Sequence, residues 1–413
     1  MINMSNIFLD DYDYVVDTIK STHPLGFLGF DGGFESSCDQ FRELVKDKNS
    51  LIIALSKLTS SLNDGHTNIE IPYGDEDLCL NIPCGWFENQ LFVTSKYNNL
   101  NFGDVIISID NMPISDYFNE LCAYIPHENT YLVKCRSTKI PYQNYHLFSK
   151  LNLNNILHND SSAYIIKIDR NGIMKEYRLE LEIYNGCVDF LNTENFIDFN
   201  IVENFAVLRI DECKYNQAFQ DKLDEFFKFV NHEKITHILL DLSENMGGNS
   251  MVTQEFIKHL DIDSYLFYGI GIRESNGDLS NLQANREVVT NEKSGHNLYN
   301  GKLSCIISNT TFSSARIFAT VLKDNHLSYM IGENSGGKPT SFGAPTKYFT
   351  PNTKIGFRVS ARIFYRPDKS KDDESSLTPD LFIPRRLSDV DYSTRIRNII
   401  EQLTKFEPNT YSS

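Results

Sequence analysis

Apolar and polar positions near the start of the chain follow the period of an α-helix. The apolar positions are Val15, Val16, Ile19, Leu51, Ile52, Leu55, Leu58 and Leu62. Apolar residues that recur three and four positions apart form one face of an amphipathic helix. We therefore predict a helical region over residues 8–70, in which Ser50 caps the second helix and Asn63-Asp64-Gly65 ends it.

The pattern changes to short runs of β-branched and aromatic residues between residues 80 and 185. These runs lie at 91–93, 105–109, 164–168 and 176–179. They predict strands, and Arg170-Asn171-Gly172 between the last two predicts a hairpin turn. The stretch 120–158 is rich in Tyr, Asn and Leu, and we interpret it as a helical insertion.

From about residue 200 onward, predicted strands alternate with predicted helices. The strands are expected at 205–210, 237–242, 303–307 and 329–331, and the helices around 219–230, 251–260, 313–324 and 396–403. This alternation is typical of a layered α/β fold. We predict a helical N-terminal region over 1–75, a β-rich domain with a helical insertion over 76–190, and an α/β core over 195–413.

Composition and charge exclude several classes of protein. The 413 residues are 41% apolar, which excludes disorder, a collagen-like repeat and a coiled coil. Lys and Arg number 39 against 55 Asp and Glu, so the net charge is −16. A chain this acidic has no general attraction for nucleic acid or for anionic lipid, and we expect neither as a partner.

The cysteines and the N-terminal segment bear on the cellular compartment. The eight cysteines include no CxxC pair, which predicts thiols in a reducing compartment rather than a metal knuckle. The N-terminal segment has no basic start followed by an apolar run, and no stretch of 18 apolar residues occurs. We therefore expect a soluble cytoplasmic protein.

Two segments at strand-to-helix junctions are candidates for chemistry. Gly247-Gly248 follows a predicted buried strand, where backbone N–H groups could stabilise an oxyanion or bind a phosphate. The alternative is a tight turn. Ser313 begins a predicted helix, where it is either a capping residue or a nucleophile presented at the edge of the sheet.

Two further residues are candidate proton acceptors. Lys338 lies between Gly337 and Pro339, 25 residues after Ser313. A lysine base must have its pKa lowered by about 3 units from roughly 10.4, and the alternative is an exposed loop lysine. His66 needs no such shift, but it does need an orienting carboxylate, and it could instead be structural. No HExxH or HxxxH motif occurs, so zinc hydrolysis has no support.

In their order along the chain, these motifs resemble the serine peptidases that include tail-specific (C-terminal processing) proteases and the tricorn core protease. The similar segments are LNDGHT at 62–67, GDVIISIDNMPI at 103–114, DLSENMGG at 241–248, TTFSSARIFATVLKDN at 310–325, IGENSGGKPTSFG at 331–343 and LTPDLFIP at 377–384. The resemblance covers most of the chain. It implies a crotonase-like (ClpP/crotonase-type) α/β core, a PDZ-like β-rich middle domain, and hydrolysis of peptide bonds in peptides or unfolded proteins.

The resemblance also implies roles for individual residues. The catalytic serine falls on Ser313. The base is Lys338 if the chain follows the processing proteases, which the lysine spacing favours, or His66 if it follows the tricorn branch. In the tricorn branch the acidic partner lies just before the Pro-Asp motif, at Asp373 or Glu374.

The implied oxyanion donors are the backbone N–H groups of Gly247 or Gly248, with Ser314 as a further candidate. This chemistry requires no metal and no organic cofactor.

The chain departs from the family pattern at several positions, and two other functions compete. Ser243 replaces an arginine, Met246 lies inside the glycine loop, and Arg316 replaces an acidic residue. The middle domain also lacks a clear Gly-Leu-Gly-Phe loop for binding a substrate C-terminus. The alternatives are an inactive member of the fold that binds a ligand or peptide, and an acyl-CoA thioester enzyme of the crotonase type. The sequence leaves the oligomeric state open.

Overall fold

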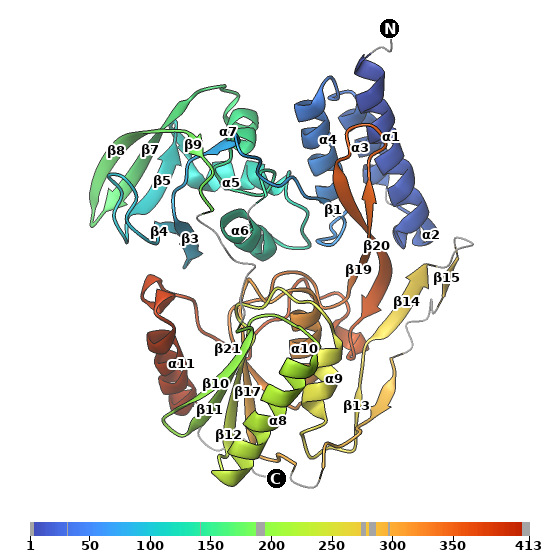
Figure 1. The fold of residues 1–413 in the computed structure, drawn as a ribbon, viewed down its shortest axis with the longest axis vertical. Coiled ribbons are helices and arrows are strands. Elements are labelled where there is room, and N and C mark those ends of the chain that lie inside the picture. Colours follow the sequence, from blue (N-terminus) through green and yellow to red (C-terminus); the bar gives the residue numbers. More distant parts are fainter. Residues whose placement is uncertain are drawn as a thin grey trace. The chain divides into compact units, whose positions relative to one another are not determined.

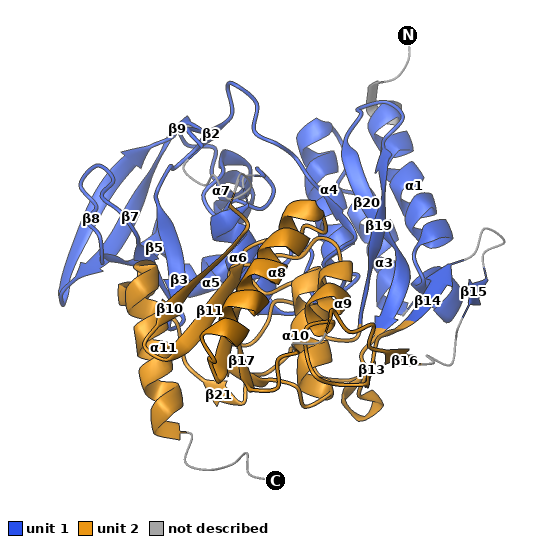
Figure 2. Cartoon of the chain, turned by 60° about the horizontal axis from the view of Figure 1, so that its bottom comes forward, with its two compact units in different colours: residues 1–191, 270–284, 341–364 blue, residues 192–269, 285–340, 365–413 orange. Residues whose placement is uncertain are grey.

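Two compact units make up this mixed α/β protein, and each combines segments that are distant in sequence (Figure 2). The computed structural model describes residues 4–30, 32–140, 142–186, 195–273, 278–280, 286–295 and 298–406. Unit 1 comprises residues 1–191, 270–284 and 341–364, and unit 2 comprises residues 192–269, 285–340 and 365–413.

The predicted helical region is the N-terminal part of unit 1. It contains α1 (Met4–Thr22), α2 (Leu25–Leu28), α3 (Gly32–Arg42) and α4 (Lys48–Ser60). The apolar stripes of α1 and α4 pack into one buried cluster, as their spacing predicts. The prediction that Ser50 caps the second helix was wrong. Asp47 is the N-cap and accepts a hydrogen bond from the Ser50 N–H at 2.8 Å, while Ser50 Oγ accepts one from the Asp47 N–H at 2.8 Å.

A twisted hairpin packs against these helices within unit 1. It consists of β19 (Ser341–Phe349) and β20 (Gly356–Tyr365), and β20 also pairs with β1 (Asn68–Ile69). The same sheet continues through β14 (Gly269–Arg273) to β15 (Leu279–Ser280). Phe357 and Val359 of β20 are buried in the cluster that α1 and α4 form, which brings the hairpin into unit 1.

The second sheet of unit 1 has the strand order β3-β4-β5-β7-β8, with β6 paired to β5. The strands are β3 (Cys84–Phe87), β4 (Gln90–Val93), β5 (Val105–Ile109), β6 (Met112–Pro113), β7 (Ala163–Arg170) and β8 (Ile173–Glu180); a separate ladder joins β2 (Leu78–Cys79) to β9 (Glu182–Ile183). The predicted hairpin is confirmed, with Asn171 and Gly172 both at positive φ in its turn. The predicted insertion is helical, as α5 (Ile114–Cys122), α6 (Thr130–Lys139) and α7 (Lys150–Leu157).

Unit 2 is built on a six-stranded sheet with the order β10-β11-β12-β17-β18-β21. The strands are β10 (Ile197–Val202), β11 (Phe205–Ile210), β12 (His237–Asp241), β17 (Lys302–Ile307), β18 (Tyr329–Gly332) and β21 (Leu381–Phe382). All neighbouring strands are parallel except β10 and β11. A small ladder of β13 (Ser264–Leu266) and β16 (Val288–Thr290) lies outside this sheet.

Helices cover both faces of this sheet (Figure 1). On one side lies α11 (Tyr392–Phe406), whose apolar face shares a cluster with Val207, Leu239, Ile306 and Ile331. Successive strand residues point to opposite faces, so the residues between these positions face the other side. That side carries α8 (Gln217–His232), α9 (Met251–Ile257) and α10 (Ser313–Asp324). The short 3₁₀ helices are η1 (Lys369–Lys371) and η2 (Leu387–Val390).

The three-part division by residue ranges stays a prediction. Residues 270–284 and 341–364 lie within the range predicted as the α/β core, yet they belong to unit 1. The predicted boundary between residues 190 and 195 coincides with residues 187–194, which lie outside the described residues. Cys187 lies in the same segment.

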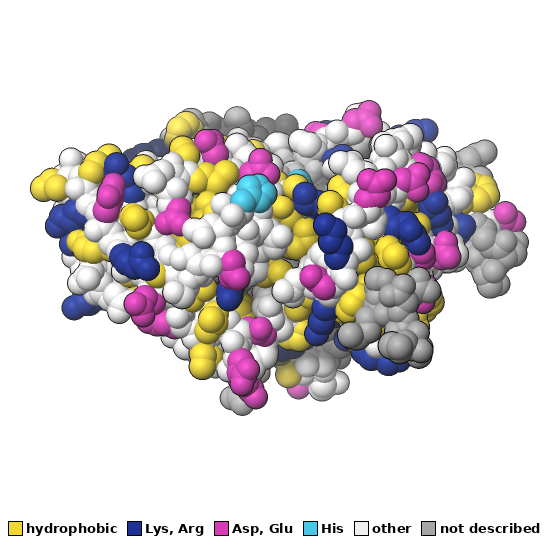
Figure 3. Space-filling view, turned by 90° about the horizontal axis from the view of Figure 1, so that it is seen from above, with side chains coloured by type: hydrophobic (Ala, Val, Ile, Leu, Met, Phe, Trp, Pro, Cys, Tyr) yellow, Lys and Arg dark blue, Asp and Glu magenta, His cyan; other side chains and the backbone are white. Residues whose placement is uncertain are grey.

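One face of the surface and the cysteines of the described residues bear on the predicted charge and thiol chemistry. On the face seen in Figure 3, acidic and basic side chains are interspersed, with hydrophobic side chains scattered between them. Among the described residues, none of the seven cysteines forms a disulfide. No helix in those ranges combines the length and the apolar character needed to cross a bilayer.

Candidate active site

The parallel strands of unit 2 bring several of the predicted site loops to one edge. β12, β17 and β18 are consecutive neighbours in the sheet, and the loops 242–249, 308–312 and 333–340 follow their carboxyl ends. Carboxyl ends of parallel strands meet at the same edge of a sheet, where α/β proteins bind their ligands. The glycine pair, Ser313 and Lys338 therefore all belong to this edge of unit 2.

Gly247 and Gly248 adopt backbone conformations that other residues rarely adopt. Their φ angles are +109° and +134°. A Cβ on Gly247 would lie 2.6 Å from Ser313 Cβ and 2.9 Å from the Ser314 nitrogen, and a Cβ on Gly248 would lie 2.4 Å from the Cys213 carbonyl oxygen. Both glycines are therefore required by close packing as well as by conformation.

Asn245 organises the glycine loop from within. Its Oδ1 accepts the Gly247 N–H at 2.8 Å, and its Nδ2 donates to the Ile210 carbonyl at 3.0 Å. Its own carbonyl accepts the Phe312 N–H at 3.1 Å, which ties the loop to the residue before Ser313. Asn245 is fully buried, so these hydrogen bonds take the place of those that its polar groups would otherwise make with water.

Ser313 stands at the first position of α10 with φ +52°. A non-glycine residue in the left-handed region is uncommon, and such conformations cluster at functional sites because they are sustained by the surrounding structure. The next residue is anchored, since Ser314 Oγ donates to the Gly248 carbonyl at 2.7 Å. The arrangement holds the serine at a sharp strand-to-helix turn directly against Gly247.

Backbone donors lie beside this serine. The Gly247 N–H is used by Asn245, so it does not face the site. In the described part of the chain, the N–H groups of Gly248 and Ser314 have no hydrogen-bond acceptor. One of these unused donors lies in the glycine loop and the other at the start of the twelve-residue helix α10, and together they match the requirements of an oxyanion hole.

Cys213 borders the same loop and is a second potential nucleophile. Burial raises the pKa of its thiol to about 12. Because the thiolate is the reactive form of cysteine, this residue is inert at neutral pH.

Lys338 lies in the loop between β18 and β19, in the same unit as Ser313, and is partly buried. The loop is fastened on both sides of the lysine. The Ser335 N–H donates to the Leu377 carbonyl at 3.0 Å, and the Tyr268 hydroxyl donates to the Pro339 carbonyl at 3.2 Å. The backbone that carries the lysine is thus fixed to unit 2.

The two acidic residues before the Pro-Asp motif differ in their surroundings. Asp373 is exposed. Glu374 accepts a hydrogen bond from Arg366 at 2.6 Å. Arg366 is fully buried and also binds Asp324 through two bonds of 2.7 and 3.0 Å. Burial opposes the charge of Arg366, but the bonds and charge of Asp324 outweigh it and raise the arginine pKa.

His66 belongs to unit 1, where α4 leads into β1. Its Nδ1 lies 3.7 Å from Asp64 Oδ1 and 4.0 Å from Glu128 Oε1. Asp64 turns the chain at this point, because its carboxylate accepts the N–H groups of His66 at 2.8 Å and Thr67 at 3.0 Å. The imidazole therefore has carboxylates within its own unit.

The Asp64 carboxylate is completely buried and extensively bonded. Besides the two backbone groups, it accepts the Ser360 hydroxyl at 2.7 Å and contacts His23 Nε2 at 3.2 Å. Burial alone would raise its pKa, but the bonds to His23 and His66 outweigh burial and lower the pKa well below its usual range. Asp64 is therefore a permanent negative charge beside the imidazole.

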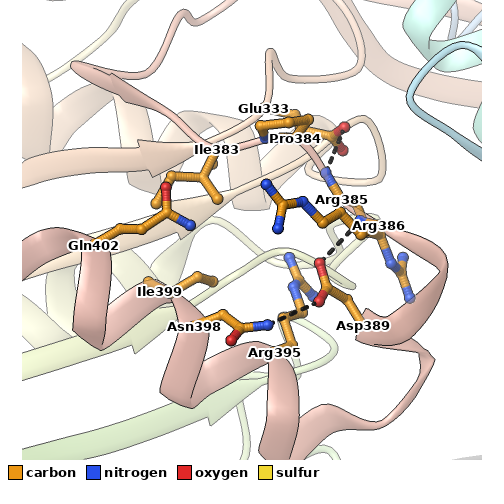
Figure 4. A pocket seen from close by; sticks show the side chains of 11 residues that line it. Glu333, Ile383, Pro384, Arg385, Arg386, Asp389, Arg395, Asn398, Ile399 and Gln402 are labelled. Carbon is orange, nitrogen blue, oxygen red and sulfur yellow. Dashed lines mark hydrogen bonds between the residues drawn. The ribbon is translucent and has the colours of Figure 1, made fainter.

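A salt bridge braces the glycine loop against the C-terminal segment of unit 2. Glu244 binds Arg385 at 2.6 Å and lies 3.8 Å from Arg395. Close by, the Arg385 N–H donates to Glu333 at 3.1 Å, beside the small pocket shown in Figure 4. The cavity of about 20 Å³ has room for roughly one water molecule, so it is no substrate site.

Several contributors to this geometry were not anticipated from the sequence. Asn245 had a signal, since an asparagine two residues before a glycine in a loop often accepts a backbone N–H. Glu128 and Arg366 had no such signal, because His66, which Glu128 approaches, and Asp324, which Arg366 binds, are far from them in the chain.

Residues 204–383 match the model of peptidase family S41. No curated protein matches the sequence.

Solved structures are similar over nearly the whole chain. Mature CPAF is 13% identical with a TM-score of 0.73, and the match covers 98% of this chain and 99% of that chain. Mature CPAF complexed with lactacystin is 14% identical with a TM-score of 0.72, covering 98% and 100%. A putative peptidase from Parabacteroides merdae is 12% identical with a TM-score of 0.55, covering 98% of each chain. At these identities the likeness shows a shared fold.

Proposed function

We propose that this chain, whose residues 204–383 match the model of peptidase family S41, is a serine-type peptidase that cleaves peptide bonds through an acyl-enzyme formed on Ser313. The observation that carries the assignment of the nucleophile is the strained φ of +52° at Ser313, pressed against Gly247. A serine at such a turn projects its Oγ from the sheet edge toward a bound substrate.

The oxyanion of the tetrahedral intermediate binds the N–H groups of Gly248 and Ser314. Support comes from their lack of any acceptor among the described residues and from the Ser314–Gly248 bond, which holds the two together. Gly247 contributes by the absence of a side chain, which leaves room beside the serine. The loss of one such donor reduces turnover by about 100- to 1,000-fold in other hydrolases.

Two residues are candidates for the base that takes the Ser313 proton. The support for His66 is that Asp64 and Glu128 lie on its Nδ1 side, so that Nε2 is the nitrogen that can accept a proton. Lys338 is supported by its spacing from Ser313. Because the carboxylates of Asp64 and Glu128 lie beside its imidazole, we prefer His66 as the base. Asp373 and Glu374 remain candidate acidic partners, supported by the sequence resemblance alone.

The finer features of the fold and the setting are also proposals. We assign unit 2 to a crotonase-like core and residues 76–190 to a PDZ-like domain, on the strand orders described above. Substrates are exposed or unfolded peptide segments, as in tail-specific proteolysis. A cytoplasmic location is supported by the absence of disulfides among the described cysteines.

Labelling with a fluorophosphonate tests the proposal. The wild-type chain should acquire one label per chain, and Ser313→Ala should acquire none. Ser250→Ala is the matched control, because Ser250 also precedes a helix of unit 2 but makes no capping bond. A folded wild-type chain that resists the reagent would favour a ligand-binding protein without peptidase activity. A rise of several degrees in melting temperature with coenzyme A thioesters would instead favour the crotonase-type enzyme.

A further inference from the structure

Three ligand-type side chains converge in unit 1 at the turn after α4. They are Asp64, His66 and Glu128, and one ligand atom from each lies within 4.8 Å of the other two. Only the first two are neighbours in sequence. Glu128 comes from the segment between α5 and α6 and is held there because its Oε1 accepts the Gly65 N–H at 3.3 Å.

The cluster is enclosed rather than superficial. The side chains of Asp64, Glu128 and His66 are 0%, 2% and 12% exposed. Clusters of carboxylates on a surface are common without a ligand, but two buried carboxylates facing one imidazole nitrogen make a defined donor set. One nitrogen and two carboxylate oxygens suit zinc and its transition-metal neighbours better than calcium or magnesium, which prefer oxygen alone.

The surroundings already hold the donors in place, as outer contacts do in metal sites. Asp64 Oδ2 is fixed by Ser360, Thr67 and His23, while Oδ1 accepts the His66 N–H and lies 3.7 Å from the imidazole Nδ1. Tetrahedral zinc sites place donors roughly 3.4 Å apart. The imidazole nitrogen lies 3.7 and 4.0 Å from the two carboxylate oxygens, and those oxygens lie within 4.8 Å of each other, so small side-chain movements would bring the three donors to that spacing.

We propose that Asp64 Oδ1, His66 Nδ1 and Glu128 Oε1 form a binding site for a divalent transition-metal ion, for which Zn²⁺ is the probe. Binding of the ion breaks no covalent bond. The ion takes the Nδ1 lone pair, so the ring proton resides on Nε2. In that state the imidazole cannot accept a proton from a nucleophile, and the ion acts as a reversible inhibitor. Only this consequence rests on the proposed function, because the site itself does not require peptidase activity.

Direct binding is measured on full-length Ser313→Ala, which keeps the cluster but cannot digest itself. After dialysis against a chelator, calorimetric titration with ZnCl₂ should give one site per chain, and Co²⁺ should give visible absorption bands of a nitrogen-containing site. Glu128→Gln and His66→Asn, each added to Ser313→Ala, should weaken Zn²⁺ binding at least about tenfold. Glutamine retains an acceptor for the Gly65 N–H, and the melting temperature of each variant checks that it folds.

His232→Ala is the matched control. His232 Nδ1 and Glu233 Oε1 lie 2.8 Å apart, but the pair is exposed and belongs to no group of three possible ligands among the described residues. Its removal should leave Zn²⁺ binding unchanged. If Ser313→Ala binds no Zn²⁺, or if folded Glu128→Gln and His66→Asn bind it as tightly as their parent, the site does not exist.

The activity measurement separates this inference from the proposed function. In the wild-type chain Zn²⁺ should suppress fluorophosphonate labelling, and a chelator should restore it. Zn²⁺ binding by a chain that never labels would refute the peptidase assignment and leave the site standing. Labelling that proceeds at full rate with Zn²⁺ bound would refute inhibition through His66.

Discussion

Gly247 and Ser313 occupy positions that exclude a side chain on the glycine, since a Cβ there would lie 2.6 Å from Ser313 Cβ. The glycine loop after β12 and the helix after β17 are thereby packed backbone to backbone. This contact explains how a serine with an unfavourable φ is held in place, and it connects the two loops most directly concerned with the proposed chemistry.

Gly247→Ala should therefore reduce kcat/KM by at least about 100-fold, because the added methyl group fills the space beside the Ser314 nitrogen. Gly172→Ala is the control for strain alone, since Gly172 has φ +83° at a hairpin tip with nothing within 4 Å. The control should lose only about 1 kcal/mol of stability and keep its activity. Equal activity losses in the two variants would contradict the packing argument. Peptide turnover and thermal unfolding measure both effects.

The identity of the base predicts opposite results for two variants. His66→Ala should lower the rate of acylation by several orders of magnitude, because the oriented imidazole is lost. Lys338→Met, which keeps the length of the side chain without its amine, should retain most of the activity. The measurement is the rate of fluorophosphonate labelling across pH 5 to 10. A full loss in Lys338→Met with His66→Ala still active would establish a serine–lysine dyad instead.

Arg366 and Asp324 form a buried ion pair with no exposed side-chain surface. Arg366→Met leaves the Asp324 carboxylate buried without its partner, which should lower the free energy of unfolding by about 3–5 kcal/mol. The double variant Arg366→Met/Asp324→Leu should be more stable than the single one, since no charge is left buried. Denaturant unfolding measures both. A single variant within about 1 kcal/mol of wild type would show that the pair is solvated or rearranged.

The buried His146 predicts a dependence of stability on acid. Burial lowers the pKa of this histidine to about 4, below the value near 6.5 of an unfolded chain. Between these values the unfolded chain binds a proton that the folded chain does not, so the free energy of unfolding falls as pH falls from about 6.5 to about 4. The expected loss from this group is up to about 3 kcal/mol.

His146→Gln should flatten that part of the pH dependence of unfolding, measured by urea titration at several pH values. His232→Gln, at an exposed position, should not change it. An unchanged slope in His146→Gln would assign the acid sensitivity to other groups, such as His127 and His259, whose pKa values burial also lowers.

Local sequence patterns predicted the helices and strands in which apolar residues recur at a regular spacing. The helix that begins at Ser313 and the buried strand before Gly247 were predicted because apolar spacing and turn residues agree there. The N-cap at Asp47 was missed by three residues, because capping depends on the geometry at the helix start rather than on residue type alone. The hairpin of β19 and β20 was not predicted. Its two strands pair locally, but its packing against α1 and α4 joins residues hundreds of positions apart.

The sequence by itself determined the order of elements, the two glycines and the serine at the strand ends, and the presence of the His66 imidazole and the Lys338 amine as candidate bases. Tertiary structure alone decided which N–H group Asn245 takes, that Arg366 binds Glu374, and that Glu128 approaches His66. The physical reason is that periodicity and turn chemistry act between neighbours along the chain. Hydrogen bonds and buried charges join whichever groups the packed core brings within a few ångströms.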